Sequence, residues 1–392
     1  MDTLLYISNV ILYIALLATS GLIIANSLLG MKWEQPVLEL IKLRTKQLSK
    51  FLFIAVLFAL CVQSMQWIEI FGIDSIQWKE VLLNTSTGKS LTYLFVLALV
   101  GLFLKRFDSM FGIIWAWVIL FGEAMNGHIA ALESSQVGTL FDYIHLFCAA
   151  IWIGGVIILW IIWRNEKSIA AKFMIRFSKI LWVTLALVAI SGVLLTILIL
   201  PSWMYLLYTS WGKWLLIKIV VISLAIGLGY LARIKIVKHH NNPKRAMLTE
   251  AILLVAIIMI ASLISQISPM PNMNNPLNVH RMGDELHYTV KLTPNAPGPN
   301  QLSVTLWTLE EEGEVATVDV SVVAEDKPSR SERDFELVQA DLEDEFAFDN
   351  FNESRFVMKD LQLPYPSNWQ AKVMITFLDG HKRSFDFTFS ND

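Results

Sequence analysis

Residues 138–163 read GTLFDYIHLFCAAIWIGGVIILWIIW, and Asp142 is their one Asp, Glu, Lys or Arg residue. A helix needs about 20 mostly apolar residues to cross the roughly 30 Å hydrocarbon core of a bilayer. This stretch is long and apolar enough, so it predicts a transmembrane helix. The whole chain has the same character, because 55% of its 392 residues are hydrophobic and 17% are charged, against about 25% charged residues in soluble proteins. The composition excludes a disordered chain and predicts a membrane protein.

Apolar runs of spanning or nearly spanning length recur along the first two thirds of the chain. Together they predict a polytopic α-helical bundle of eight transmembrane helices in the cytoplasmic membrane, with the lipid bilayer as its surroundings. The third and fourth runs are short and are separated by a polar turn, which favours a helical hairpin. The expected spans are residues 4–30, 51–71, 91–106, 110–125, 138–163, 176–202, 213–236 and 247–268.

The loops between these runs differ in basic charge. Segments 31–50, 164–180 and 233–246 each carry five Lys or Arg residues, and they alternate with loops that hold few. Cytoplasmic loops of membrane proteins are enriched in Lys and Arg. We therefore expect these three segments in the cytoplasm and both termini of the chain outside.

The last third of the sequence has a different charge and a different periodicity. Residues 1–268 hold 21 Lys or Arg and 12 Asp or Glu, whereas residues 269–392 hold 10 and 22. Apolar and polar residues alternate at 287–292, 303–307 and 371–377, a pattern typical of half-buried strands. We expect a membrane domain over 1–268 and a small extracytoplasmic all-β domain over 269–392, an immunoglobulin-like sandwich. The acidic segment 325–350 is expected to be a loop or an insertion.

Several ionisable residues fall inside the predicted spans, where they are expensive and usually functional. Most of them lie in the outer portion of their helices, whereas Glu250 lies near the inner end of the last span. His128 lies in the loop between the fourth and fifth spans. This distribution predicts a site that is loaded from the outer face. The outer set is Glu69, Glu123, Asp142, His145 and Lys218.

The fifth span carries the most informative pattern. Asp142, His145, Ala149, Trp152 and Val156 recur at intervals of three and four residues, so they form one stripe along a helix. A carboxylate one turn from an imidazole can hold one ring nitrogen and leave the other for a metal. The alternative is a histidine with a purely structural hydrogen bond. Two soft donors each lie three residues from a histidine and extend the candidate ligand set, namely Met125 and Cys148.

A second group of potential ligands follows the last span. Thioethers and imidazoles together favour copper, and Cu(I) over Cu(II). The alternative is a Pro- and Asn-rich linker in which Met and His are incidental. The group, which with His128 and His145 completes the proposed metal ligands, is Met270, Met273, His280, Met282 and His287.

The ordered motifs of the helical part resemble those of the copper resistance D (CopD) membrane family. They are NGHIA at 126–130, DYIHL at 142–146 and AIWIGG at 150–155. Further agreement comes from RFS at 176–178, SG at 191–192, WGK at 211–213 and Lys218. The resemblance implies copper handling at the cytoplasmic membrane, usually uptake. It makes His128 and His145 the transport ligands, with Asp142 and Glu250 as supporting or gating carboxylates.

The last third resembles the FixH/YtkA-like β-sandwich that often follows such a membrane domain. The similarity rests on TPNAPGPN at 293–300, LQLP at 361–364 and NW at 368–369. Relatives commonly carry a copper resistance C domain before the first span, and this sequence starts directly at that span. The Met/His segment or a separate extracytoplasmic copper-binding protein is therefore expected as the outer copper acceptor.

Three functions fit these observations. The first is a copper permease or copper-resistance protein. The second is a haem-binding electron-transfer protein of the cytochrome b561 type, for which the sequence offers few intramembrane histidines. The third is a membrane-anchored copper-binding chaperone. No hydrolytic triad, nucleotide-binding loop or HExxH motif occurs, so we expect neither an enzyme nor a nucleic-acid partner.

Overall fold

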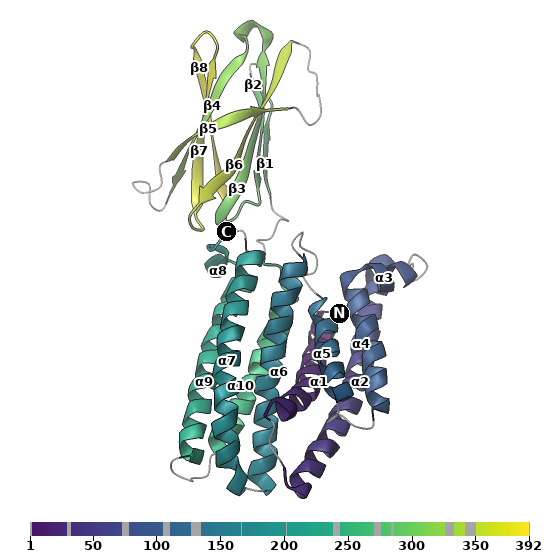
Figure 1. The fold of residues 1–392 in the computed structure, drawn as a ribbon. Coiled ribbons are helices and arrows are strands. Elements are labelled where there is room, and N and C mark those ends of the chain that lie inside the picture. The colour runs from purple at the N-terminus through teal and green to yellow at the C-terminus, as the bar shows by residue number, and fades with distance from the viewer. Residues whose placement is uncertain are drawn as a thin grey trace. The chain divides into compact units, whose positions relative to one another are not determined.

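The computed structural model describes residues 2–29, 33–72, 78–104, 110–126, 135–165, 167–200, 202–237, 244–269, 276–283, 286–325, 333–341 and 350–391. The chain divides into two compact units (Figure 1). One is helical and comprises Met1–Pro201 and Trp214–Ile267. The other contains the strands and comprises Ser202–Lys213 and Ser268–Asp392. Each unit is described by itself.

The helices are long and apolar. Within the described residues, seven are long and apolar enough to cross a membrane, and α5 (Met110–Ala124) is a shorter apolar helix. Two further helices, α3 (Trp78–Asn84) and α8 (Tyr205–Tyr208), are short. The chain is therefore a multi-pass membrane protein. The seven long helices are α1 (Asp2–Leu29), α2 (Gln35–Phe71), α4 (Ser86–Phe103), α6 (Ser135–Asn165), α7 (Lys167–Ile199), α9 (Ser210–Val237) and α10 (Lys244–Ile264).

Each expected span falls on one apolar helix, but two helices begin earlier than expected. α2 starts at Gln35 rather than near residue 51, with Pro36 in its first turn, a position that favours helix initiation. Val37 and Ile41 are buried while Lys42 and Lys46 are exposed. An amphipathic helix therefore forms where hydropathy alone indicated a loop. α7 likewise starts within the basic segment 164–180.

Helix α1 lies at the centre of the bundle and packs against α2, α5, α6 and α10. A Cβ atom added to Gly154 on α6 would lie 2.0 Å from the carbonyl oxygen of Gly21 on α1, so the two backbones touch. Small residues permit such close approach between membrane helices. On the neighbouring side, a Cβ atom on Gly155 would lie 2.0 Å from the Phe177 ring of α7. The glycine pair thus fixes α6 between α1 and α7.

The second unit, called the β unit, consists mainly of β-strands. In its described residues eight strands lie antiparallel to their neighbours, in the order β1-β2-β3-β6-β5-β4-β7-β8. The predicted strands at 287–292, 303–307 and 371–377 are confirmed as parts of β2, β3 and β7. The strands are β1 (Leu277–Arg281), β2 (Leu286–Thr293), β3 (Gly298–Leu309), β4 (Val315–Ala324), β5 (Arg333–Ala340), β6 (Phe351–Leu363), β7 (Asn368–Phe377) and β8 (Lys382–Ser390).

Strand β5 corrects the expectation that 325–350 is only a loop or an insertion. Its first part pairs with β4 and its last residues, Val338–Ala340, pair with β6, so β5 joins the two halves of the sheet. Leu337 is buried in the core and Phe335 packs against it, whereas the intervening Glu336 is exposed. This alternation supports a strand within an acidic segment. The composition of the segment indicated a loop because it is rich in acidic residues.

Candidate functional site

His145 lies on α6 and lines a cavity of about 80 Å³ formed by side chains of α1, α6, α7, α9 and α10. Its Nδ1 lies 3.1 Å from Oγ of Ser191 on α7. The Ser191 hydroxyl donates to the carbonyl oxygen of Val188 at 3.1 Å, so the serine oxygen accepts a hydrogen bond from Nδ1–H of the imidazole. This tautomer leaves a lone pair on Nε2, the nitrogen that can bind a metal.

We expected Asp142 to hold this imidazole, but in the structure Ser191 takes that position. Asp142 instead interacts electrostatically with Lys218 on α9. Lys218 lines the His145 cavity and also interacts with His145. The sequence pattern did not single out Ser191, because one serine in an apolar span is not distinctive. Its one trace was the SG pair at 191–192, where Gly192 leaves space beside the His145 ring.

Glu123 on α5 belongs to the same polar group. Its side chain is 3% exposed and accepts hydrogen bonds from the side chains of Tyr13 and Asn126. Among the residues that the structure describes, its Oε2 atom has no hydrogen-bond partner. Tyr13 lines the His145 cavity from α1, and Asp142 interacts electrostatically with Glu123. Five helices therefore bring buried and half-buried polar groups together, an arrangement typical of ion or substrate pathways in membranes.

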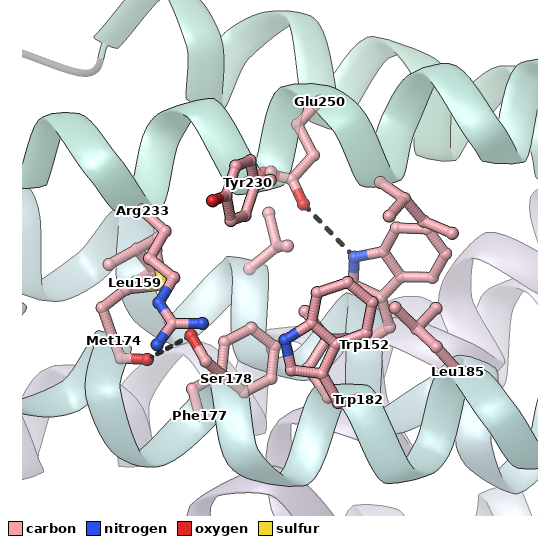
Figure 2. A pocket seen from close by; sticks show the side chains of 14 residues that line it. Trp152, Leu159, Met174, Phe177, Ser178, Trp182, Leu185, Tyr230, Arg233 and Glu250 are labelled. Carbon is pink, nitrogen blue, oxygen red and sulfur yellow. Dashed lines mark hydrogen bonds between the residues drawn. The ribbon is translucent and has the colours of Figure 1, made fainter.

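A second, smaller cavity of about 40 Å³ lies among α6, α7, α9 and α10. Figure 2 shows Trp152 with its indole nitrogen turned toward Glu250, to whose Oε1 it donates a hydrogen bond of 3.2 Å. Glu250 is 4% exposed. A Cβ atom on Gly229 would lie 2.9 Å from Oε1, so the glycine makes room for the carboxylate. Arg233 also lines this cavity.

The stripe predicted on α6 is present in the structure. His145, Ala149 and Trp152 line the first cavity, and Trp152 and Val156 line the second. The helical period therefore identified correctly which face of α6 looks into the bundle.

Other predicted residues lie elsewhere. Cys148 is buried but lines a different cavity, together with Lys179 and Thr184. Met125 follows the end of α5 and, like Cys148, is not part of the lining described for the His145 cavity. Glu69 is exposed near the end of α2. The remaining predicted ligands of this group fall outside the described residues, namely His128, Met270 and Met273.

In the β unit, His280 and His287 lie on one face of the sheet. His280 pairs in register with Thr289 of β2, two residues from His287 and on the same face. Nδ1 of His280 lies 2.8 Å from Oγ1 of Thr289, and the ring of His287 meets Phe351 edge-on with centroids 4.5 Å apart. Met282 is 64% exposed beyond β1. The two histidines are thus neighbours on adjacent strands.

Across the described part of the chain, no group of three or more His, Cys, Asp or Glu residues has the arrangement of a metal site. His145 and its polar neighbours therefore form a chamber with one good nitrogen ligand rather than a closed coordination sphere.

Comparison with known proteins bears on the same helices. Residues 171–265 match the family described as copper resistance protein D. Over 250 residues the chain is 27% identical to the copper transport protein CutJ of Bacillus subtilis, a match that covers 58% of this chain and 46% of CutJ. The chain thus spans about half the length of this relative. The segment that carries Ser191, Lys218 and Glu250 is therefore the part of the chain that is similar to copper resistance protein D.

Proposed function

We propose that this protein moves copper across the cytoplasmic membrane, in the direction of uptake, and that the His145 cavity is its loading site. The observation that carries the proposal is the contact of His145 Nδ1 with Ser191 beside the cavity, because an imidazole whose Nδ1–H donates to the serine keeps a lone pair on Nε2 for a metal. The similarity to the copper transport protein CutJ supports copper as the cargo. The protein acts as a carrier and not as an enzyme.

The polar group around the cavity suits a cation. With Asp142 and Glu123 both ionised, the polar group would hold two carboxylates and the ammonium of Lys218, which interacts with Asp142. It would then carry net negative charge near the imidazole. A carboxylate in a low-dielectric interior attracts a cation far more strongly than in water. Imidazole is a good ligand for copper in both oxidation states, and thioether ligands elsewhere in the chain would favour Cu(I).

The β unit is proposed to lie outside the membrane as a FixH/YtkA-like domain that passes copper to the bundle. Its two histidines on one sheet face would supply the ligands, with Met270, Met273 and Met282 as soft donors. A separate extracytoplasmic copper-binding protein would be the source of the metal. The domains would then be residues 1–268 and 269–392.

The test is copper accumulation by cells that depend on this protein under copper limitation. His145→Ala is expected to lower the protein-dependent accumulation by about tenfold or more, because the loss of a metal ligand costs at least as much as the loss of its supporting partner. Cys148→Ala is the matched control, since it lies on the same helix but lines another cavity. Equal accumulation by wild type and His145→Ala, at equal amounts of folded protein in the membrane, would contradict the proposal.

A further inference from the structure

The His145 cavity and the Glu250 cavity follow one another along four shared helices, α6, α7, α9 and α10. The His145 cavity is lined by residues 145–153 of α6 and 218–222 of α9. The cavity that contains Glu250 is lined by residues 152–159 and 226–233 of the same helices. Among the residues that the structure describes, Trp152 alone lines both cavities. Trp152 is therefore the residue at which the two cavities meet.

Trp152 is held in this place from the other side of the bundle. It is 6% exposed, and its indole N–H donates to Glu250 of α10, a residue 98 positions away in the chain. Gly229 of α9 accommodates the carboxylate that accepts this bond. Figure 2 shows the tryptophan, the carboxylate and the cavity between α7 and α10. The hydrogen bond thus joins α6 to α10 at the residue where the two cavities meet.

We propose that Trp152 is a gate between the two cavities and that Glu250 is its latch, an inference that rests on the proposed copper transport. Trp152 lies seven positions after His145 on the stripe, about 10 Å further along the helix axis. An ion at His145 meets the apolar indole before it can reach the next cavity. The carboxylate that holds the ring is also the next anionic group on this route.

The latch has a physical basis for opening. A cation bound by Oε1 of Glu250 would draw electron density from the oxygen that accepts the indole N–H, which weakens this hydrogen bond. The two interactions compete, so arrival of a cation at the carboxylate releases the ring. The same competition closes the gate when the cation leaves.

The test measures how fast Ag⁺, a soft monovalent probe for Cu(I), reaches each cavity. Two single-cysteine reporters in a background with Cys61→Ala and Cys148→Ala serve this purpose. Ala149→Cys reports on the His145 cavity and Ser178→Cys reports on the Glu250 cavity. Spheroplasts are exposed to Ag⁺ for different times, quenched and denatured, and the thiols that remain free are counted with a maleimide mass tag. Inside-out vesicles give the rates from the opposite side.

With Trp152 intact, Ag⁺ applied from the His145 side should protect Ala149→Cys much faster than Ser178→Cys. Trp152→Phe, which keeps a ring but loses the N–H, should speed protection of Ser178→Cys by about tenfold, the effect expected for a hydrogen bond to a charged group. Trp152→Ala should make both reporters react alike. Glu250→Gln keeps an oxygen that accepts the indole N–H but loses the charge that attracts the cation, so it should leave protection of Ser178→Cys unchanged or slow it, whereas Glu250→Ala should accelerate it as Trp152→Phe does.

Unchanged protection of Ser178→Cys in both Trp152 variants would overturn the gate. Equal acceleration in Glu250→Gln and Glu250→Ala would overturn the hydrogen bond as the latch. Two controls ensure that misfolded protein is not counted. Each reporter must label fully after denaturation, and each variant must elute as a single species. Failure of the proposed function has a different signature, because His145→Ala would then accumulate copper as wild type does, whatever the reporters show.

Discussion

At the scale of the residue, the orientation of one imidazole governs the site. Ser191 accepts a hydrogen bond from His145 while its own proton goes to Val188. A serine in this position selects the tautomer without adding charge to the membrane interior. A carboxylate there would have bound the metal as well as the imidazole. In the tautomer whose Nδ1–H donates to Ser191, Nε2 keeps the lone pair that a metal would use.

This role of Ser191 can be tested by substitution. Ser191→Ala should weaken copper binding and copper accumulation by about tenfold, because loss of a hydrogen-bond partner to a ligating histidine typically costs 10- to 100-fold in metal affinity. Ser223→Ala is the control, since Ser223 is exposed on α9 and bonds only to the carbonyl oxygen of Ile219 in its own helix. Copper titration of the purified variants would measure the effect, and equal affinities would exclude the role.

At the scale of the element, the bundle depends on the contact between α1 and α6. The backbones meet at Gly21 and Gly154, and this contact sets which face of α6 turns toward the cavities. Sequence periodicity identified the stripe on α6 but not the neighbouring residue to which each position points. Cys148 illustrates the limit, because it lies three positions from His145 and yet lines another cavity.

A pair of glycine substitutions tests this contact. Gly154→Ala should destabilise the protein by about 1–3 kcal/mol or more, since the added Cβ would lie 2.0 Å from a backbone oxygen that cannot move aside easily. Gly227→Ala should be tolerated or slightly stabilising, because nothing lies within 4 Å of its added Cβ and alanine favours a helix over glycine. Thermal unfolding in detergent compares the two. Equal melting temperatures of the two variants would show that stability does not depend on the close backbone contact between α1 and α6.

At the scale of the whole molecule, the charge of the chain predicts its orientation. Segment 31–50 is basic, so the positive-inside rule predicts that it lies in the cytoplasm, and eight spans would then leave the β unit outside. With Cys61→Ala, Leu378→Cys of the β unit should react with a membrane-impermeant maleimide in intact cells. Lys46→Cys should react only after the cells are permeabilised. Both original residues are exposed in the structure, so the reverse labelling pattern would invert the topology.

The sequence by itself determined the membrane bundle, the change to strands after residue 268 and the inward stripe of α6. These are local properties: hydropathy, period and charge act within a segment, and backbone in lipid must satisfy its hydrogen bonds within helices. Only the tertiary structure decided that Ser191 holds His145, that Trp152 bonds Glu250 and that Cys148 turns elsewhere. Such contacts join positions 46 and 98 residues apart. They depend on the rotation and depth of each helix. Packing between helices sets both, so the sequence of one segment does not specify them.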